Sequence, residues 1–151
     1  MLRARINDEL KTAMKARDGV AVSTLRLILA ALKDRDIAAR TNGQDAGVEE
    51  GEILRMIQTM IRQRGDSIEA YEKGGRQELA DRERQEIVIL QRFLPRQMGE
   101  AEIRQAVDAM IAEAGAEGLK DMGRVMAALR QAHAGQMDFG KASGIVRERL
   151  A

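Results

Sequence analysis

Cysteine and tryptophan are absent from this 151-residue chain, which holds a single proline and a single histidine. Without cysteine there can be no disulfide, thiolate nucleophile, cysteine-bound zinc or iron–sulfur cluster. The absence is typical of a reducing compartment, so we expect a cytoplasmic location. No apolar run reaches the roughly 18 residues of a membrane-spanning helix, and the first residues lack the apolar stretch of a secretory signal. We therefore expect no membrane partner.

Aromatic residues are almost as scarce, with only Tyr71, Phe93 and Phe139 present. The apolar content comes instead from Ala, Leu, Ile, Val and nine Met, and 32% of the residues are charged. This mixture of strong helix formers predicts an all-α protein. So few aromatic side chains also leave no platform on which nucleic-acid bases could stack.

Apolar residues recur three and four positions apart, which predicts amphipathic helices. The spacing places them at residues 2–17, 20–40, 49–72, 76–94, 100–114, 122–133 and 139–150. Gly19 follows the first helix and suits the left-handed conformation that often ends one. Pro95 disfavours helical geometry at the residue before it. We therefore predict an N-terminal four-helix domain at 1–95 and a C-terminal three-helix domain at 96–151.

Charge is distributed unevenly, although the net charge is only +1. Residues 1–41 hold nine basic and five acidic residues, residues 42–118 hold ten and sixteen, and residues 119–151 hold six and three. The two ends are therefore basic and the middle is acidic. A polyanion would be attracted to the ends.

One short pattern occurs twice, 17 residues apart: Asp121-Met-Gly-Arg and Asp138-Phe-Gly-Lys. We interpret Asp121 and Asp138 as helix N-caps in preference to parts of a phosphate site, because a capping carboxylate occupies the amides that would hold a phosphate. The basic side chains beside them, Lys120, Arg124 and Lys141, are candidate contacts.

Catalytic or metal-binding patterns are not evident in the chain. His133 falls on an apolar stripe and is expected to be a packed or capping residue, since no cluster of acids accompanies it. The acids at 49–52 suit a helix N-terminus. The charged runs at 62–64 and 82–84 are predicted to be solvated helix faces. We expect no metal, no cofactor and no catalytic residue.

Several stretches together resemble the GatB/YqeY domain family. They are Thr24–Lys33, Asp66–Tyr71, Glu86–Leu90, Phe93–Gln97 and, most specifically, Lys120–Met126 followed by Gly135 and Asp138. Their order and spacing cover nearly the whole chain. The resemblance implies four N-terminal and three C-terminal helices. It also implies similarity to the tail of the B subunit of the glutamine-dependent aspartyl/glutamyl-tRNA amidotransferase, where the tail helps to hold tRNA.

The family is associated with carbon–nitrogen ligase activity with glutamine as amido donor. This chain matches only the tail, so we expect no transamidation by the chain alone. The resemblance implies tRNA contacts at Lys120, Arg124, Arg130, Lys141 and Arg147. Two positions depart from the family pattern: Gln136 stands where a Lys is usual, which removes a positive charge, and Gly99 replaces a Ser cap.

Three functions follow from the sequence, in decreasing order of weight. The first is a non-catalytic accessory module that binds tRNA. The second is an interaction module that docks a protein, for instance one of the tRNA-charging pathway, without binding RNA. The third is an independent small enzyme. The surroundings of Lys120, Arg124 and Lys141 discriminate between the first two, because cations paired with acids would favour the second.

Overall fold

Seven α-helices and one short 3-10 helix make up the computed structural model, which describes residues 1–151 and contains no strand. The all-α prediction is confirmed. The helices are α1 (Leu2–Lys15), α2 (Gly19–Thr41), α3 (Glu50–Lys73), α4 (Gln77–Gln91), α5 (Glu100–Ala114), η1 (Leu119–Asp121), α6 (Met122–Ala132) and α7 (Phe139–Leu150). None of the helices is long and apolar enough to cross a membrane.

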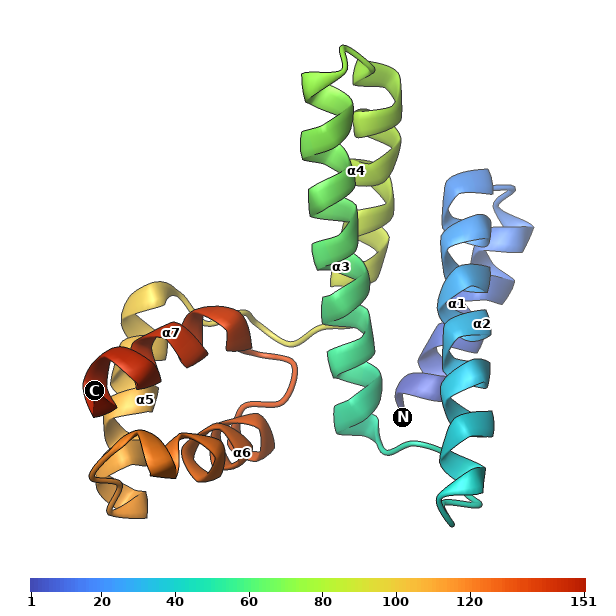
Figure 1. The fold of residues 1–151 in the computed structure, drawn as a ribbon. Helices are drawn as coiled ribbons and strands as arrows, with labels where there is room; N and C mark the ends of the chain where they lie inside the picture. Colours follow the sequence, from blue (N-terminus) through green and yellow to red (C-terminus); the bar gives the residue numbers. More distant parts are fainter. The chain divides into compact units, whose positions relative to one another are not determined.

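Residues Met1–Leu94 form the first of two compact units, and Pro95–Ala151 form the second. In the first unit, α1 and α2 make one antiparallel hairpin and α3 and α4 make another (Figure 1). Their apolar stripes meet in one core, whose most buried members include Ile6, Leu25, Ile28, Ile57, Leu90 and Phe93. Burial of these stripes is the main force that holds the two hairpins together.

The turn between α1 and α2 differs from the sequence-based prediction. Arg17, not Gly19, takes the left-handed conformation after α1, with φ of 55°. Gly19 is instead the first residue of α2. Asp18 is the N-cap of that helix and accepts a hydrogen bond from the Ala21 N–H at 3.1 Å. The left-handed residue therefore lies two positions earlier than expected, and a non-glycine residue carries the strain.

A polar clamp ties the α2–α3 loop to α1. The Arg3 guanidinium donates to both carboxylate oxygens of Asp36, at 2.6 and 2.7 Å, and to the Val48 carbonyl oxygen at 2.9 Å. The Val48 N–H also donates to Asp36, at 2.9 Å. These contacts, with that of Arg3 first, lower the pKa of Asp36 to about 2, although burial acts in the opposite direction. The clamp fixes the loop against the first hairpin.

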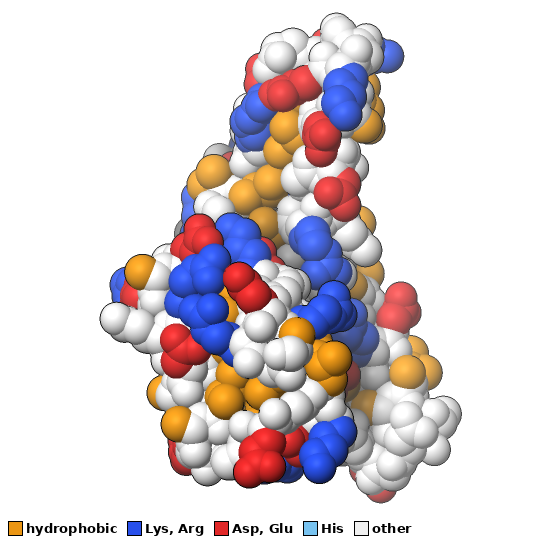
Figure 2. Space-filling view, turned by 60° about the vertical axis from the view of Figure 1, so that its left-hand side comes forward, with side chains coloured by type: hydrophobic (Ala, Val, Ile, Leu, Met, Phe, Trp, Pro, Cys, Tyr) orange, Lys and Arg blue, Asp and Glu red, His pale blue; other side chains and the backbone are white.

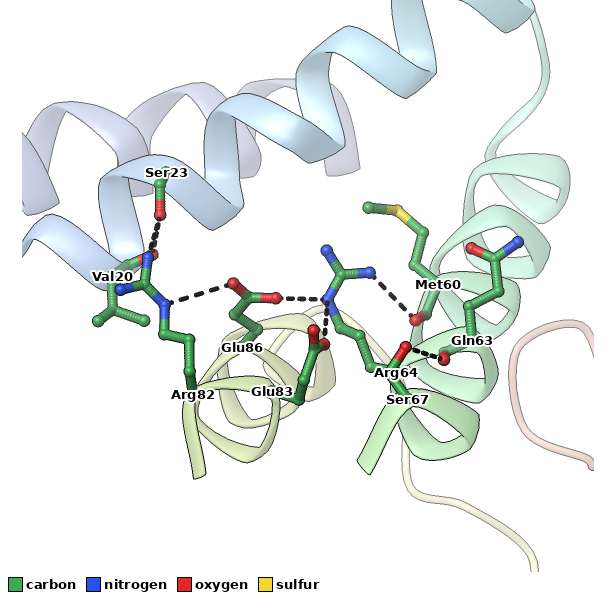
Figure 3. Close-up of polar contacts among 9 residues, drawn as sticks. All are labelled: Val20, Ser23, Met60, Gln63, Arg64, Ser67, Arg82, Glu83 and Glu86. Atoms are coloured by element: carbon green, nitrogen blue, oxygen red, sulfur yellow. Dashed lines mark hydrogen bonds and ion pairs between the residues drawn. The ribbon is translucent and has the colours of Figure 1, made fainter. Parts of the chain in front are cut away.

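Most residues of the charged runs at 62–64 and 82–84 are exposed, as predicted, but Arg64 and Glu83 are partly buried and are not part of a solvated face. Arg64 has an exposed side-chain fraction of 13%, as does Glu86, whose carboxylate accepts from Arg64 Nε at 2.9 Å. Glu83 lies 4.0 Å from the same nitrogen. On the other side of Glu86, Arg82 reaches Ser23 of α2 at 3.0 Å. Figure 3 shows this network joining α2, α3 and α4.

The second unit packs α5, α6 and α7 around a separate core. Val107, Val125, Leu129, Met137 and Val146 are its most buried members. The segment that enters the unit is bound to the α6–α7 loop. The side-chain amide of Gln97 donates to the Gly135 carbonyl oxygen at 2.6 Å, and the Met98 N–H donates to that of Gln136 at 2.7 Å. The start of the unit thus fixes the loop that connects its last two helices.

Candidate nucleic-acid interface

The five basic residues implied by the resemblance lie on η1, α6 and α7 of the second unit. All five are exposed: Lys120, Arg124, Arg130, Lys141 and Arg147. Lys120 belongs to η1, Arg124 and Arg130 to α6, and the other two to α7. Their apolar neighbours turn inward, since Val125 and Leu129 on α6 and Ile145 and Val146 on α7 are buried. The cations are therefore carried on the outer sides of two amphipathic helices.

Exposed positions extend the 17-residue repeat beyond the four residues noted in the sequence. Arg124, Ala127 and Arg130 on α6 correspond in spacing to Lys141, Gly144 and Arg147 on α7, and all six are exposed. Residues three apart share one face of a helix. Each helix therefore presents a small residue between two cations. We call these six residues, with Gly123 and Gly140, the α6–α7 surface.

Small residues leave the helix backbone open at this surface. A Cβ added at Gly123 or Gly144 would meet nothing within 4 Å, whereas one at Gly140 would lie 3.2 Å from Asp138 Oδ1. No neighbouring helix fills the space at Gly123. The sequence could have indicated the exposed small residues Ala127 and Gly144, because the 17-residue repeat extends to them.

Asp138 caps α7 as predicted, and its carboxylate accepts from the N–H groups of Gly140 at 3.0 Å and Lys141 at 3.1 Å. Asp121 is likewise the N-cap residue of α6, but the predicted capping by its side chain is not found. Helix η1 leads directly into α6, which turns this carboxylate back toward the preceding loop, where it accepts from the Glu117 N–H at 3.0 Å.

Arg124 is held in place by its neighbours. It donates to Asp121 Oδ1 at 3.1 Å and to the carbonyl oxygen of Ala114 at the end of α5. The pKa of Asp121 is lowered, first by the Glu117 N–H and then by Arg124. Arg130 lies over the Phe139 ring, with Cζ 6.0 Å from the ring centroid. That contact links the end of α6 to the start of α7.

The remaining three cations, Lys120, Lys141 and Arg147, make no ion pair. Other arginines of the same unit are paired: Arg96 with Glu102, Arg104 with Glu100 and Glu148, and Arg149 with Asp108. Figure 2 brings the second unit forward and shows Lys and Arg side chains beside an area of apolar side chains. Positive charge is therefore unbalanced locally, although acids lie elsewhere on the unit.

His133 is the half-buried C-cap of α6, as predicted, and its N–H donates to the Leu129 carbonyl oxygen at 2.9 Å. No group of three or more His, Asp or Glu side chains lies close enough together to hold a metal ion. What the α6–α7 surface offers chemically is positive charge and open backbone. Such an arrangement attracts a polyanion and lets its backbone come close.

Comparison with known proteins identifies relatives in fungi. A protein of Lachancea thermotolerans, named altered inheritance of mitochondria protein 41, mitochondrial, is 34% identical over 112 residues, which cover 73% of this chain and 58% of that protein. Its namesake in Vanderwaltozyma polyspora is 34% identical over 89 residues, covering 59% and 46% of the two chains. The chain thus spans about half the length of the curated relatives it matches.

An uncharacterised protein of Schizosaccharomyces pombe is 30% identical over 94 residues, which cover 62% of this chain and 72% of that protein. Because the names of several relatives include the word mitochondrial, the cytoplasmic location stays a prediction. The sequence profile of the family described as YqeY-like protein matches residues 3–150. With nearly its whole length matched, the chain belongs to the YqeY-like protein family.

Proposed function

We propose that the second unit is an accessory RNA-binding module that contacts the phosphate backbone of tRNA through the α6–α7 surface and Lys120. The module contributes binding and carries out no reaction of its own. Any amide-transfer chemistry lies in other proteins that share the RNA. The proposal rests chiefly on one observation, the three exposed cations that have no acid partner, Lys120, Lys141 and Arg147.

Small residues between the cations support backbone contact. Lysine and arginine bind phosphates by charge, and a neighbouring side chain would hold the RNA strand away from the helix. Gly144, between Lys141 and Arg147, leaves room for the strand. The only aromatic ring near this surface, Phe139, is half-buried and lies beneath Arg130. Recognition by stacking on bases is therefore not favoured.

The choice of tRNA among RNAs rests on the resemblance of Lys120–Met126, Gly135 and Asp138 to the amidotransferase B-subunit tail. Gln136 weakens the match by one positive charge. Its backbone carbonyl nevertheless binds the Met98 N–H, so the loop is held by a contact that does not depend on the side chain.

A salt-dependent titration of fluorescent tRNA with the full chain tests the proposal. Substituting Lys120, Lys141 and Arg147 by Gln removes three charges that have no partner. We expect the slope of log affinity against log salt to shrink by about 2 to 3, since each phosphate contact contributes about 0.7 to 0.9. The matched control replaces the paired Arg96, Arg104 and Arg149 by Gln, with the same change in net charge.

If the two triple variants have equal slopes of log affinity against log salt, the RNA does not bind at Lys120, Lys141 and Arg147. Absence of tRNA binding by the unmodified chain at low salt would end the proposal. The pairing of Arg124 with Asp121 favours the second candidate, a module that docks a protein without RNA. A partner protein that stays bound after nuclease treatment, with no affinity for tRNA, would support that candidate instead.

A further inference from the structure

A second line of unpaired cations lies on α2, in the first unit. Arg26, Ala30, Lys33, Ile37 and Arg40 follow one another at spacings of four, three, four and three residues, and all five are exposed. This spacing keeps them on one side of the helix, which we call the outer face of α2. The opposite side carries the buried residues of the helix, among them Leu25, Ile28 and Leu32.

None of the three cations of this face makes an ion pair with an acid, although Arg40 lies near enough to Asp36 to help lower the pKa of that carboxyl. At a rise of about 1.5 Å per residue, the line from Arg26 to Arg40 is about 21 Å long. The one exposed acid of α2, Asp34, is four residues from Ala30 and three from Ile37, so it lies at the edge of this face.

Helix α3 offers a comparison within the same unit. Its exposed cations, Arg55, Arg62 and Lys73, are interspersed along the helix with acids that include Asp66 and Glu69, and Lys73 is paired with Glu69. The outer side of α3 is therefore of mixed charge, whereas the outer face of α2 carries only positive charge.

The turn beside α2 adds two more exposed cations, Lys15 and Arg17. Arg17 occupies a left-handed position, where glycine would be free of strain. A strained residue that persists in an exposed turn points to a use for its side chain. Here that side chain adds positive charge at the end of the α1–α2 hairpin.

We propose that the outer face of α2 is a second contact surface for the backbone of the same RNA, so that each unit holds the RNA separately. This inference rests on the proposed function. The face contains three cations and only one large apolar residue, Ile37, whereas the buried cores of protein interfaces are depleted in most charged residues, lysine among them, although arginine is enriched there. Exposed lysine and arginine in a line are instead the groups that contact phosphates.

Two surfaces on one chain have an energetic consequence. Once one unit has bound, the second binds the same molecule at a high effective concentration, so the joint affinity exceeds that of either surface alone. Losing the α2 contacts should then lower the overall affinity even though the α6–α7 surface is intact.

The experiment uses the full chain with one purified tRNA, titrated from about 50 to about 200 mM salt. The test variant replaces Arg26, Lys33 and Arg40 by Gln. The matched control replaces Arg55, Arg62 and Arg92 by Gln. These residues are also exposed, and their loss changes the net charge by the same amount. We expect the test variant to lose about tenfold or more in affinity and 2 to 3 in salt slope, while the control keeps the slope of the unmodified chain.

Cross-linking gives a second readout that does not depend on charge. A photoreactive residue is placed at Ile37, which is 51% exposed on the outer face of α2, or at Val88, which is 55% exposed on α4. We expect the first position to cross-link to tRNA and the second to do so far less. An unchanged thermal unfolding midpoint shows that each variant is folded.

Two results overturn the inference in distinguishable ways. If the unmodified chain binds tRNA and the α2 variant retains its slope, α2 is not a contact, although the proposed function stands. If the unmodified chain does not bind tRNA, both fall. Cross-links from Ile37 to a protein, with an unchanged RNA slope, would assign the face to a protein partner and would also overturn the inference.

Discussion

The α3–α4 hairpin and the α6–α7 pair are both rich in arginine and differ in what those arginines contact. In the hairpin, Arg64 crosses from α3 to Glu86 of α4, and Arg84 crosses back from α4 to Glu72 of α3. In the α6–α7 pair, Lys141 and Arg147 point outward with only Gly144 between them. Arg124 and Arg149 of the α6–α7 pair are also paired with acids, so the two regions differ in that Lys141 and Arg147 remain without an acid partner.

This difference shows that the number of cations in a segment is a poor guide to nucleic-acid binding. What matters is whether an acid on a neighbouring helix neutralises them. Removing a paired cation should therefore change the stability of the fold, and removing an unpaired one should change binding. Four predictions test that distinction, beginning with the largest effect.

Replacing Arg64 by Met removes the 2.9 Å ion pair of Glu86 and leaves Glu86 with only the 3.4 Å contact from Arg82 Nε, in a site where little water reaches Glu83 and Glu86. We expect a loss of about 2 to 3 kcal/mol in the free energy of unfolding, somewhat below the value for a fully buried pair. The pKa of Glu83 is already raised, first by burial and then by Glu86, so losing Arg64 should raise it further. Urea unfolding measures the loss.

The controls for this variant are Arg62→Met in the same helix and Lys141→Met in the second unit. Both side chains are exposed, so each substitution should change stability by no more than about 0.5 kcal/mol. A loss at Lys141 as large as that at Arg64 would contradict the contrast between the two regions.

The Arg3–Asp36 clamp gives the second prediction, on pH dependence. The folded pKa of Asp36, about 2, lies below its ordinary value of 3.8. The stabilisation is therefore complete above about pH 4 and is lost as the pH falls toward 2. We expect Asp36→Asn to cost about 1 to 2 kcal/mol at pH 7, since Arg3 is partly open to solvent.

Urea unfolding of both proteins at pH 7, 4 and 2.5 measures the effect of Asp36→Asn. The difference in unfolding free energy between the unmodified protein and Asp36→Asn should become smaller between pH 4 and pH 2.5. A difference that stayed constant down to pH 2.5 would show that the clamp contributes packing and not charge.

Local sequence patterns accounted for the helices but not for contacts between them. The predicted helices at 100–114 and 139–150 match α5 and α7 because caps and apolar spacing act within a single segment. The burial of Arg64 depends on α4 packing beside it, which no local pattern reveals. Helix η1 was missed for a similar reason, and with it the reversed orientation of Asp121. The five candidate RNA contacts stay predictions.

The glycines of the α6–α7 surface give the third prediction, in which stability and binding change in opposite directions. Gly144→Ala should raise the unfolding free energy by about 0.5 to 1 kcal/mol, and Gly123→Ala by less, because Ala favours the helix and its Cβ meets no neighbour. Both should weaken tRNA binding by obstructing the backbone. Thermal unfolding and the tRNA titration, made on the same preparations, decide this. Unchanged binding by the stabilised variants would remove the glycines from the interface.

The smallest expected effect concerns the α1–α2 turn, where the sequence and the structure make opposite predictions. If Gly19 were the left-handed residue, Gly19→Ala would be destabilising. Because Gly19 instead begins α2 with open space around it, we expect Gly19→Ala to be neutral or to stabilise by a few tenths of a kcal/mol.

Arg17→Gly should stabilise by about 0.5 kcal/mol, since relief of the left-handed strain exceeds the added flexibility of glycine in the unfolded chain. If the same Arg17→Gly variant also binds tRNA more weakly, an unpaired cation in the first unit behaves like those of the α6–α7 surface, and its strain is explained by binding. Stabilisation without any loss of affinity would leave Arg17 as a residue of the turn alone, with no part in RNA binding.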